Sequence, residues 1–339
     1  MMRTTRAASL IALLWAAICA AHADPVKLRV GWSDVPSSIM PILDRTPDLA
    51  THLGKTYNLD PIHFAGTAPM ITALATGDLD IGEMAFGSFG LAIQNAHLTD
   101  IRVIADEMED GVPGYLSIPY VVLKDGPVKT AADMKTRVAA TNVVGSGTDI
   151  GMRAALRKAG LEDKRDYSEI EVPYASMKDA LKQGRADLIA TVHSTVLDPE
   201  LQAIARPLLY LRDGMGVTAI LFRVARAPFI AANRAALVDL FEDEDRALRW
   251  YLDPANHAKA VQIAAAFNKN SPAVYDSWLF TKSDIYRDPD NLPPLKALQS
   301  NLETQKAAGF LNIDIDVAKF ADTSIVAEAA KRVAAGGPR

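Results

Sequence analysis

The stretch Thr141-Asn-Val-Val-Gly-Ser-Gly-Thr-Asp-Ile-Gly151 joins an apolar segment typical of a strand to a segment typical of a helix. A glycine-rich turn of this kind is a favourable seat for an anion, because the first N–H groups of the helix are unpaired and its dipole places partial positive charge there. Gly145 and Gly147 allow a ligand close to the backbone, and Ser146 and Thr148 add hydroxyls. The alternative is that Ser146 or Thr148 only caps the helix.

Strand and helix patterns alternate through the first part of the chain. Apolar or alternating segments of the kind that form strands lie at 26–30, 61–65, 79–81 and 101–105. Helical patterns lie between them, at 70–75 and 89–96. This order is typical of a parallel, doubly wound sheet, so the predicted fold class is α/β.

An internal repeat extends this pattern to the stretch quoted first. Five residues recur with one displacement of 107 positions: Met70, Ala73, Leu74, Gly77 and Asp80 return as Met177, Ala180, Leu181, Gly184 and Asp187. With a displacement of 108, Arg29-Val30 matches Arg137-Val138. A helix that ends at glycine before a buried strand is a common local solution, which explains the glycines but not the shared spacing. The repeat therefore predicts two similarly built α/β lobes.

Residues 1–23 have the pattern of a secretory signal peptide. Two arginines precede an apolar run at 7–21 that is too short to span a bilayer, and Ala21-His22-Ala23 fits a cleavage site. Cys19, the only cysteine, lies within the removed part. We therefore expect the mature chain from Asp24 in the periplasm without a thiol, which excludes disulfides, cysteine-ligated zinc and cysteine nucleophiles.

The mature chain is acidic and long. It keeps 34 of the 36 lysine and arginine residues and all 41 aspartate and glutamate residues, a formal charge of −7. This balance argues against a nucleic-acid partner, for which a basic patch would be expected. About 316 residues are enough for two domains of ordinary size. No later run is long and apolar enough to cross a membrane.

Two extended apolar stretches, 117–123 and 217–224, are candidate crossings between the lobes. After Pro228 the pattern becomes helical almost to the end, in segments at 231–252, 254–268, 272–280, 295–308 and 317–334. Such a helical tail packs most economically on the first lobe.

Several motifs, taken in order, resemble those of a known family. They are Gly77-Asp-Leu-Asp-Ile-Gly82, Tyr120-Val-Val-Leu-Lys-Asp-Gly-Pro-Val-Lys-Thr-Ala-Ala-Asp-Met134, Arg137-Val-Ala-Ala, Gly145-Ser-Gly147 and Leu156-Arg-Lys-Ala-Gly160. Over nearly all of the mature chain, the sequence resembles the periplasmic solute-binding proteins of the nitrate, sulfonate and taurine ABC importers. The resemblance implies a type II periplasmic binding protein fold, in which two doubly wound lobes joined by two crossing strands close over a ligand in the cleft.

The resemblance also implies how the chain is divided and what it works with. Because both crossings connect the lobes, lobe one is expected to be discontinuous, at 24–118 and 222–339, with lobe two at 119–221. We expect a monomer without cofactor or metal, which delivers a small anion to an inner-membrane permease with a cytoplasmic ATPase.

The candidate ligand site follows from the sheets, because open α/β sheets bind ligands beyond the carboxyl ends of their strands. Turns of lobe one supply Trp32, Ser33, Asp34, Gly66, Thr67, Phe86, Gly87 and Ser88. Turns of lobe two supply Asn142, Ser146, Gly147, Thr148, Tyr174 and His193. The resemblance to the family extends to Ser33, Gly66, Gly87, Ser146 and Thr148, whereas position and chemistry alone single out Trp32, Phe86, Tyr174 and His193.

Some of these residues have a structural alternative. Trp32 and Phe86 either stack on a ligand or fill the core of lobe one. His193 either starts a helix or faces the cleft opposite Phe86, where its charge would respond near neutral pH. The run Glu242-Asp-Glu-Asp245 is interpreted as a solvated helix face.

Other function classes are weaker but open. A secreted hydrolase would combine Ser194 with His193 and Asp213, yet adjacent side chains on a strand diverge and the sequence has no nucleophile-elbow motif. Pyrimidine-precursor synthases of thiamine biosynthesis share the broad fold, but they carry a cysteine-rich motif and work inside the cell. A binding protein that feeds a sensor uses the same cleft as one that feeds an importer. The sequence favours a binding protein over an enzyme.

The strand-end turns contain neither lysine nor arginine, so backbone N–H groups and hydroxyls would hold an anion without a bidentate salt bridge. This suits a sulfonate, nitrate or a single carboxylate better than a dianion. Two finer readings stay open. Asp34 and Glu83 would neutralise the ammonium of an aminosulfonate such as taurine, whereas Trp32, Phe86 and Tyr174 would enclose an aromatic acid.

Overall fold

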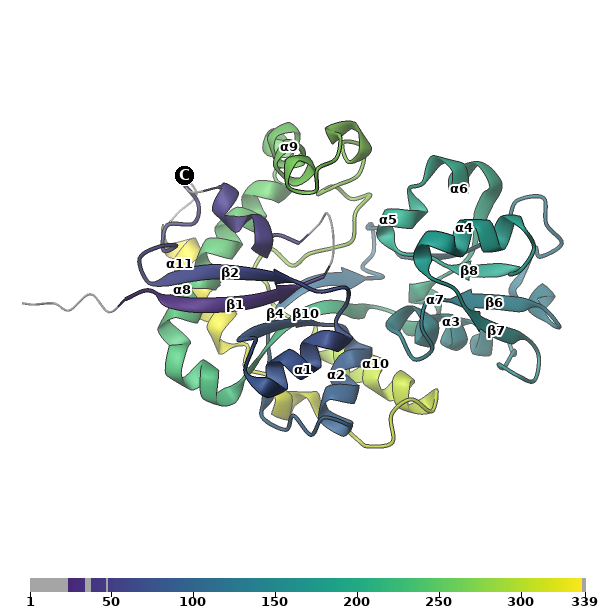
Figure 1. The fold of residues 1–339 in the computed structure, drawn as a ribbon, viewed down its shortest axis with the longest axis horizontal. Coiled ribbons are helices and arrows are strands. Elements are labelled where there is room, and N and C mark those ends of the chain that lie inside the picture. The colour runs from purple at the N-terminus through teal and green to yellow at the C-terminus, as the bar shows by residue number, and fades with distance from the viewer. Residues whose placement is uncertain (1–23, 34–37, 47, 337–339) are drawn as a thin grey trace, which may run out of the picture.

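The protein is described by a computed structural model that covers residues 24–33, 38–46 and 48–336. It has two lobes side by side, each built on one five-stranded sheet with helices on both faces (Figure 1). The predicted α/β fold class with two lobes is therefore confirmed. The expected signal peptide at 1–23 lies outside the described residues.

The sheet of lobe one has the strand order β2-β1-β3-β10-β4. Its strands are β1 (Val26–Trp32), β2 (Tyr57–His63), β3 (Ile81–Met84), β4 (Ile101–Asp110) and β10 (Thr218–Arg226). β1 pairs in parallel with β2 and β3, and β10 runs antiparallel between β3 and β4. The antiparallel strand thus comes from much later in the sequence than its neighbours.

The sheet of lobe two repeats this plan in the order β7-β6-β8-β5-β9. Its strands are β5 (Pro119–Leu123), β6 (Val138–Thr141), β7 (Ser168–Glu171), β8 (Leu188–Ala190) and β9 (Ala205–Tyr210). β6 pairs in parallel with β7 and β8, and β5 runs antiparallel between β8 and β9. The predicted lobe boundary between 221 and 222 falls inside β10, so the division of the chain at that point stays a prediction.

The glycines of the sequence repeat have the same conformation in both lobes. Gly77 and Gly184 follow helices of lobe one and lobe two with positive φ angles of 78° and 69°. Glycine adopts this left-handed region without the steric cost that a side chain brings. The shared glycines are therefore explained by the backbone they must form.

The aspartates of the repeat accept hydrogen bonds from a neighbouring strand. The residue whose backbone N–H they reach differs by one position between the two lobes. The carboxylate of Asp80 accepts from the backbone N–H of Arg29 at 2.9 Å and from its guanidinium at 2.6 Å. That of Asp187 accepts from the backbone N–H of Val138 at 3.0 Å, and from the guanidinium of Arg137 at 3.2 Å. The backbone of β1 in lobe one therefore corresponds to that of β6 in lobe two with a displacement of 109 residues. The sequence match indicates a displacement of 108 residues.

Helices before the C-terminal tail follow the alternating pattern. Lobe one has the 3-10 helix η1 (Met40–Arg45), α1 (Ala68–Thr76) and α2 (Phe86–Gln94). Lobe two has η2 (Ala131–Met134), α3 (Gly147–Lys158), α4 (Tyr174–Lys182), α5 (His193–Val196), α6 (Pro199–Ile204) and α7 (Leu211–Met215).

The C-terminal tail is helical and packs on lobe one, as predicted (Figure 1). It contains α8 (Ala227–Leu252), η3 (Pro254–Asn256), α9 (His257–Phe267), η4 (Pro272–Val274), α10 (Leu295–Ala307), η5 (Val317–Phe320) and α11 (Ser324–Gly336). The helix predicted at 272–280 is wrong beyond η4, because turns follow and Phe280 has a φ of 60°. No helix in the described part of the chain has both the length and the apolar character needed to cross a membrane.

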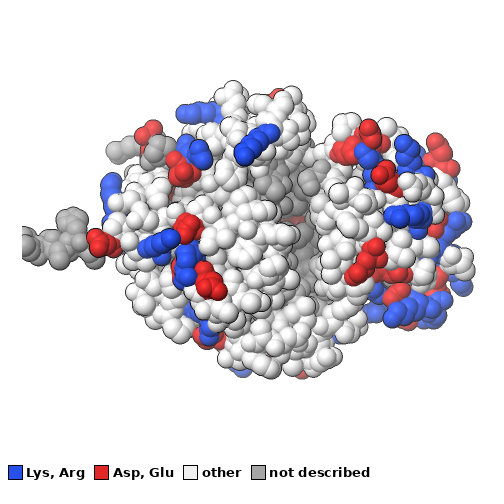
Figure 2. All heavy atoms as spheres, viewed as in Figure 1, with Lys and Arg blue, Asp and Glu red and all other residues white. Residues whose placement is uncertain are grey.

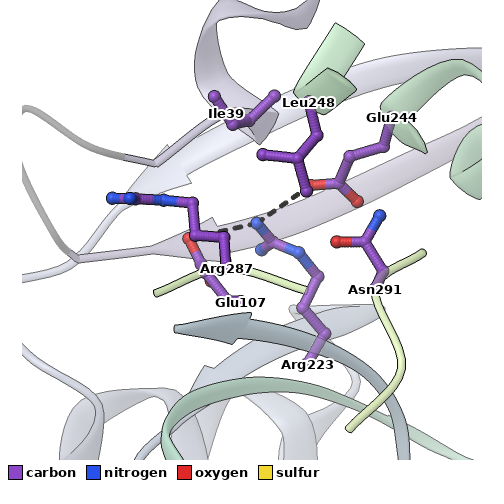
Figure 3. Close-up of a pocket in the computed structure, with 7 residues that line it drawn as sticks. All are labelled: Ile39, Glu107, Arg223, Glu244, Leu248, Arg287 and Asn291. Carbon is purple, nitrogen blue, oxygen red and sulfur yellow. Dashed lines mark hydrogen bonds and ion pairs between the residues drawn. The ribbon is translucent and has the colours of Figure 1, made fainter. Parts of the chain in front are cut away.

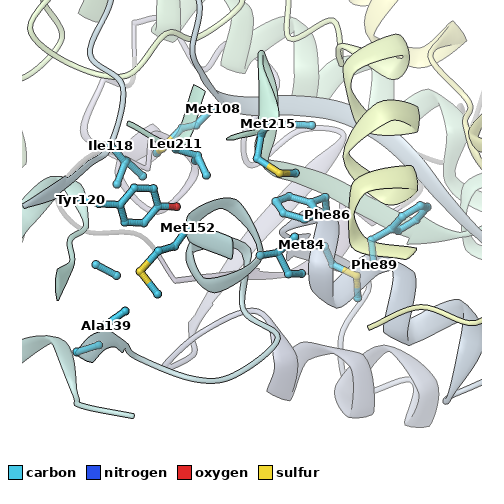
Figure 4. Packing of buried hydrophobic residues seen from close by; sticks show 14 of the residues in the cluster. Met84, Phe86, Phe89, Met108, Ile118, Tyr120, Ala139, Met152, Leu211 and Met215 are labelled. Carbon is cyan, nitrogen blue, oxygen red and sulfur yellow. The ribbon is translucent and has the colours of Figure 1, made fainter. Parts of the chain in front are cut away.

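Two apolar clusters form the interior. One lies within lobe one, where side chains of η1, α8, α9 and α11 pack together on one face of the sheet. The other continues from lobe one into lobe two; Figure 4 shows part of it, including Met84 and Phe86 of lobe one and Tyr120, Met152 and Met215 beyond β4. The lobes therefore share an apolar contact where they meet.

Candidate ligand-binding site

A hollow separates much of the two lobes in the space-filling view (Figure 2). Where the lobes touch, the starts of α2 and α3 face each other. A Cβ added to Gly147 would lie 3.1 Å from Cε1 of Phe86, and one added to Gly87 would lie 3.4 Å from the carbonyl oxygen of Gly145. The structure thus brings predicted site residues of the two lobes together.

Four predicted site residues of lobe two form one hydrogen-bonded group. The amide oxygen of Asn142 accepts from the hydroxyls of Ser146, Thr148 and Tyr174, at 2.9, 3.1 and 3.1 Å. The hydroxyls of Thr148 and Tyr174 are also 2.9 Å apart. Burial raises the pKa of Tyr174 to about 12, so its hydroxyl stays protonated at neutral pH. We call these four residues the hydroxyl–amide cluster.

The start of α3 is partly closed by its own side chains. Ser146 is the N-cap, and its hydroxyl accepts from the N–H of Asp149 at 3.3 Å. The carboxylate of Asp149 accepts in turn from the N–H of Gly145 at 2.6 Å. The N–H groups of Gly147 and Thr148 have no hydrogen-bond partner among the described residues. Ser146 therefore does cap the helix, and two N–H groups remain for a ligand.

Asp149 brings a negative charge close to this seat, and Arg153 compensates it. The guanidinium of Arg153 contacts Asp149 at 2.7 Å, and Asp163 and Glu169 at 2.6 Å each. Burial, followed by the charge of Asp149, raises the pKa of Glu169 to about 8. With Glu169 neutral at pH 7, this network carries a net charge of about −1. A second negative charge on a ligand at the start of α3 would be repelled.

The two aromatic candidates of lobe one are buried within the protein. Phe86 is fully buried in the apolar cluster that joins the lobes. Trp32 is 8% exposed and packs against His63 and Phe267, with ring centroids 4.5 and 5.5 Å apart. Both thus pack against other side chains of the protein, and their contact with a ligand stays a prediction.

Three further candidates of lobe one surround the starts of α1 and α2. The hydroxyl of Ser88 bonds to the N–H and the carbonyl oxygen of Ala85, so it caps α2. Thr67 precedes α1 but makes no side-chain cap. A Cβ added to Gly66 would meet no atom within 4 Å. Gly66 and Thr67 are therefore the more available of the three.

The remaining candidates are placed less completely. Asp34 lies outside the described residues, and of His193 only the backbone, which begins α5, is described. The hydroxyl of Ser33, at the end of β1, bonds to the carboxyl of Glu83. Glu83 is fully buried in lobe one, so it reaches a ligand only if the residues around it move, and its contact with an ammonium stays a prediction.

The sequence profile of the NMT1-like family matches residues 21–199, more than half of the chain. The chain belongs to the NMT1-like family. The matched region includes the strands from β1 to β8, and so all the predicted site residues from Trp32 to His193. A comparison with curated proteins finds no match to the sequence.

Solved structures share the fold of this NMT1-like protein. The aliphatic sulphonate binding protein of Escherichia coli is 21% identical with a TM-score of 0.69, over 87% of this chain and 92% of that one. The nitrate-binding protein of Synechocystis PCC 6803 is 16% identical with a TM-score of 0.68, over 91% and 89%. A desulfurization enzyme is 13% identical with a TM-score of 0.64, over 91% and 99%. The predicted periplasmic-binding-protein architecture is confirmed, at identities that show the fold alone.

The NMT1-like chain also contains buried charges that the sequence analysis missed. Glu83, Glu107, Arg223 and Glu244 form the group that we call the lobe-one charge cluster. Figure 3 shows the last three of them, with Arg287 and Asn291 beside them. Nη2 of Arg223 lies 3.2 Å from Glu107 and 3.4 Å from Glu244, while its Nε and Nη1 have no partner among the described residues. A cavity of about 10 Å³, room for about one water molecule, lies beside them. The sequence contains one indication of this cluster, because Glu83 and Arg223 each lie inside an otherwise apolar strand, β3 and β10.

The acidic run at 242–245 was misinterpreted as a solvated helix face. All four side chains are buried, with residue exposures of 6%, 0%, 3% and 0%. Asp243 accepts from the N–H groups of Thr51 and His52 and from the hydroxyl of Tyr57, and Asp245 accepts from the amide of Asn291. The partners come from distant segments, which is why the local sequence did not reveal the burial.

One group of side chains has the composition of a metal site. The ligand atoms of His52, Asp239 and Glu242 lie within 4.8 Å of one another. However, Arg332 contacts Asp239 at 2.9 Å and Glu242 at 3.6 Å, and Arg246 pairs with the other oxygen of Glu242. The group precedes β2, at the end of the sheet opposite to the strand ends that meet lobe two. It is best described as an ion-pair network.

Proposed function

We propose that this protein captures a small organic or inorganic monoanion between its lobes and delivers it to the permease of an ABC importer. The observation that carries the proposal is the hydroxyl–amide cluster at the start of α3, beside the unpaired N–H groups of Gly147 and Thr148. The two N–H groups and the amide N–H of Asn142 are neutral donors at the positive end of a helix dipole, and the hydroxyls join them if they turn from Asn142 toward the ligand; this is the chemistry that recognises an anion.

A monoanion fits this arrangement better than a dianion. The donors are neutral, and the Arg153 network behind them keeps a net charge of about −1. A sulfonate, nitrate or single carboxylate needs only such donors, whereas a dianion gains more from a cationic partner such as arginine. The proteins of similar fold include a sulphonate binding protein and a nitrate-binding protein, which agrees with this class. Because a desulfurization enzyme has a similar fold, catalysis on a small molecule in the same cleft is the alternative function.

Export to the periplasm and partnership with a permease are part of the same proposal. They rest on the pattern of residues 1–23 and on the fold. In the hydrolase alternative, Asp213 would orient His193, but the carboxylate of Asp213 accepts from the N–H of Tyr210 and caps α7. A sensor partner uses the same cleft; loss of uptake of the bound anion in cells without the protein would separate import from sensing.

The test is a thermal-shift and calorimetry panel of ethanesulfonate, taurine, nitrate and benzoate, with sulfate as the dianion. A bound anion at 100 times its dissociation constant raises the free energy of unfolding by roughly 2.7 kcal/mol. Thr148→Ala should weaken binding by roughly 0.5 to 1.5 kcal/mol, up to tenfold. The matched control is Thr130→Ala, which removes an exposed hydroxyl that donates to Asp133 at 3.0 Å.

Three results would contradict the proposal. They are the absence of binding by every anion of the panel, tighter binding of sulfate than of the monoanions, and release of a chemically altered product from catalytic amounts of protein. Equal weakening by Thr148→Ala and Thr130→Ala would place the site away from the start of α3.

A further inference from the structure

The end of α10 and the loop that follows it contact the start of α2 and the turn before α3, where the two lobes meet. Nε2 of Gln305, a fully buried side chain, donates to the carbonyl oxygen of Gly87 at 3.1 Å. The ring of Phe310 packs on Gly145, where an added Cβ would lie 3.2 Å from Cδ1 of the ring. One segment of the C-terminal tail, which packs on lobe one, thus reaches the proposed anion seat of lobe two.

Phe310 also reaches the network that orders this turn. Cζ of Arg153 lies 5.5 Å from the centroid of the Phe310 ring, a distance at which an aromatic face attracts a guanidinium. Arg153 contacts Asp149 at 2.7 Å, and Asp149 accepts from the N–H of Gly145 at 2.6 Å. The ring therefore supports Gly145 twice, once by direct packing and once through Arg153 and Asp149.

Two hydrogen bonds hold the ring of Phe310 at this place. Nη1 of Arg157, which lies one turn after Arg153 in α3, donates to the carbonyl oxygen of Ala307 at 3.0 Å. Within the tail, the N–H of Phe310 donates to the carbonyl oxygen of Gln305 at 3.1 Å. The position of the ring is thus set from lobe one through Gln305 and from lobe two through Arg157.

The turn before α3 needs such support because its own backbone is permissive. Gly145 has a φ of 82°, and Gly147 follows two residues later. Glycine adopts many backbone conformations at little steric cost, so packing must select one arrangement of a turn with two glycines. The N–H groups of Gly147 and Thr148, which have no hydrogen-bond partner among the described residues, follow directly. Their arrangement therefore depends on how Gly145 is held.

We propose that Phe310 is a positioning residue for anion capture, which holds the turn before α3 in its anion-binding arrangement from the other lobe. The inference rests on the proposed function, because this turn must contact the bound anion. Since the ring belongs to the tail and the turn belongs to lobe two, the site is fully ordered only while this interlobe contact is made. Coupling between two binding events is reciprocal, so the bound anion strengthens the contact by the same factor as the contact strengthens anion binding.

The first test compares Phe310→Ala with the wild-type protein by calorimetry, using ethanesulfonate and nitrate as probes. The apparent affinity falls in proportion to the fraction of molecules whose site is correctly arranged. Loss of the ring should weaken both probes by roughly tenfold, a typical size for a contact between an arginine and an aromatic ring. Phe310→Tyr keeps the ring and should bind within about twofold of the wild type. Should Phe310→Ala not fold, Phe310→Leu keeps apolar volume and should still weaken binding by about threefold.

Phe320→Ala is the matched control. Phe320 is another half-buried phenylalanine of the tail that packs against the same apolar cluster, and Cζ of Arg102 lies 6.0 Å from its ring centroid. Its aromatic neighbour is Phe89 of α2, with ring centroids 6.3 Å apart. This variant should lose a similar part of the free energy of unfolding and keep the wild-type affinity. Equal weakening of binding by the two alanine variants would reveal a general loss of packing and would overturn the inference.

Hydrogen exchange measured by mass spectrometry gives a readout that needs no ligand. The amides of residues 142–149 should exchange faster in Phe310→Ala than in the wild type, while the same segment keeps its wild-type exchange in Phe320→Ala. Saturating ethanesulfonate should slow the exchange of residues 305–310 in the wild type, as the reciprocal coupling requires. Unchanged exchange of residues 142–149 in Phe310→Ala would overturn the inference whether or not anions bind.

The remaining outcomes separate the inference from the proposed function. Wild-type affinity in Phe310→Ala, or in Phe310→Leu where the alanine variant does not fold, would overturn the inference and leave the proposed function intact. The same holds if Phe310→Tyr binds as weakly as Phe310→Ala, or if a bound anion leaves the exchange of residues 305–310 unchanged. The absence of binding by the wild-type protein to every anion of the panel would overturn the two together.

Discussion

Arg153 in lobe two and Arg223 in lobe one each stand among three carboxyls, but they are bonded differently. All three guanidinium nitrogens of Arg153 reach a carboxylate within 2.7 Å, and its side chain is 13% exposed. Only Nη2 of Arg223 reaches carboxylates, at 3.2 and 3.4 Å, and its side chain is 1% exposed. The two lobes share a backbone plan and do not share their interior electrostatics.

The difference assigns separate roles to the two groups. The Arg153 network orders Asp149, which in turn caps the start of α3. In the lobe-one charge cluster a single nitrogen of Arg223 reaches only Glu107 and Glu244, so the pairing is weaker, and burial raises the pKa of Glu244 to about 7. A repeat that preserves strand order and helix-ending glycines thus leaves each lobe free to acquire its own chemistry.

The largest expected effect is on stability. Arg153→Met should lower the free energy of unfolding by about 3–5 kcal/mol, because it strands carboxylates that cannot all become neutral. Arg223→Met should cost less, and less still at acidic pH, since burial already raises the pKa of Glu244 to about 7 and a proton can replace the cation. Urea unfolding near pH 5.5 and near pH 8 measures both. Equal losses for the two variants at both pH values would remove the distinction between the clusters.

Next in size is the loss of binding in Gly147→Val. An added Cβ would already lie 3.1 Å from Phe86, and a branched side chain would also cover the N–H groups at the start of α3. Binding of the panel anions should weaken by roughly 100-fold, about 2.7 kcal/mol, in calorimetry. Gly336→Ala, at the exposed end of α11 where a Cβ meets no atom, is the control. A folded Gly147→Val protein with wild-type affinity would show that the anion is held elsewhere.

The smallest expected effect, per pH unit and per group, is the change in the free energy of unfolding with pH. Burial is the largest cause that raises the pKa of Glu109 to about 7, and that of Asp245 and Glu169 to about 8. The folded state therefore binds more protons than the unfolded chain between about pH 4 and about pH 8. Stability should fall as the pH rises through this window, by at most about 1.4 kcal/mol per unit for each group.

Thermal unfolding across this window measures the slope, and Asp245→Asn should reduce it. Stability that rises between pH 5 and pH 8 would contradict this prediction, because it would mean that the buried carboxyls of both lobes are ionised and paired in the folded protein.

Much of the fold was predictable because its signals are local. The spacing of Gly77 and Asp80, repeated at Gly184 and Asp187, reflects a helix end and a strand start that each lobe must form. The one-residue shift at β6 was not predictable, since it depends on which backbone N–H the aspartate reaches across the sheet.

The site was predictable where its partners are close in sequence. The contacts among Asn142, Ser146 and Thr148 lie within one turn and the following helix start, and the structure brings them together; their contact with a ligand stays a prediction. The burial of the run at 242–245 and of Glu83 depends on partners such as Arg223, far away in the chain. No pattern within one segment reports such a pairing.

The position of β10 has a consequence for how the protein acquires its structure. Every strand of lobe two lies between residues 119 and 210, whereas the sheet of lobe one stays open between β3 and β4 until residues 218–226 join it. During synthesis from the N-terminus, all strands of lobe two are therefore present before the last strand of lobe one, although lobe one begins earlier. Until then, β3 and β4 each expose an unpaired edge, so a chain truncated before β10 should be a substrate for chaperones and proteases.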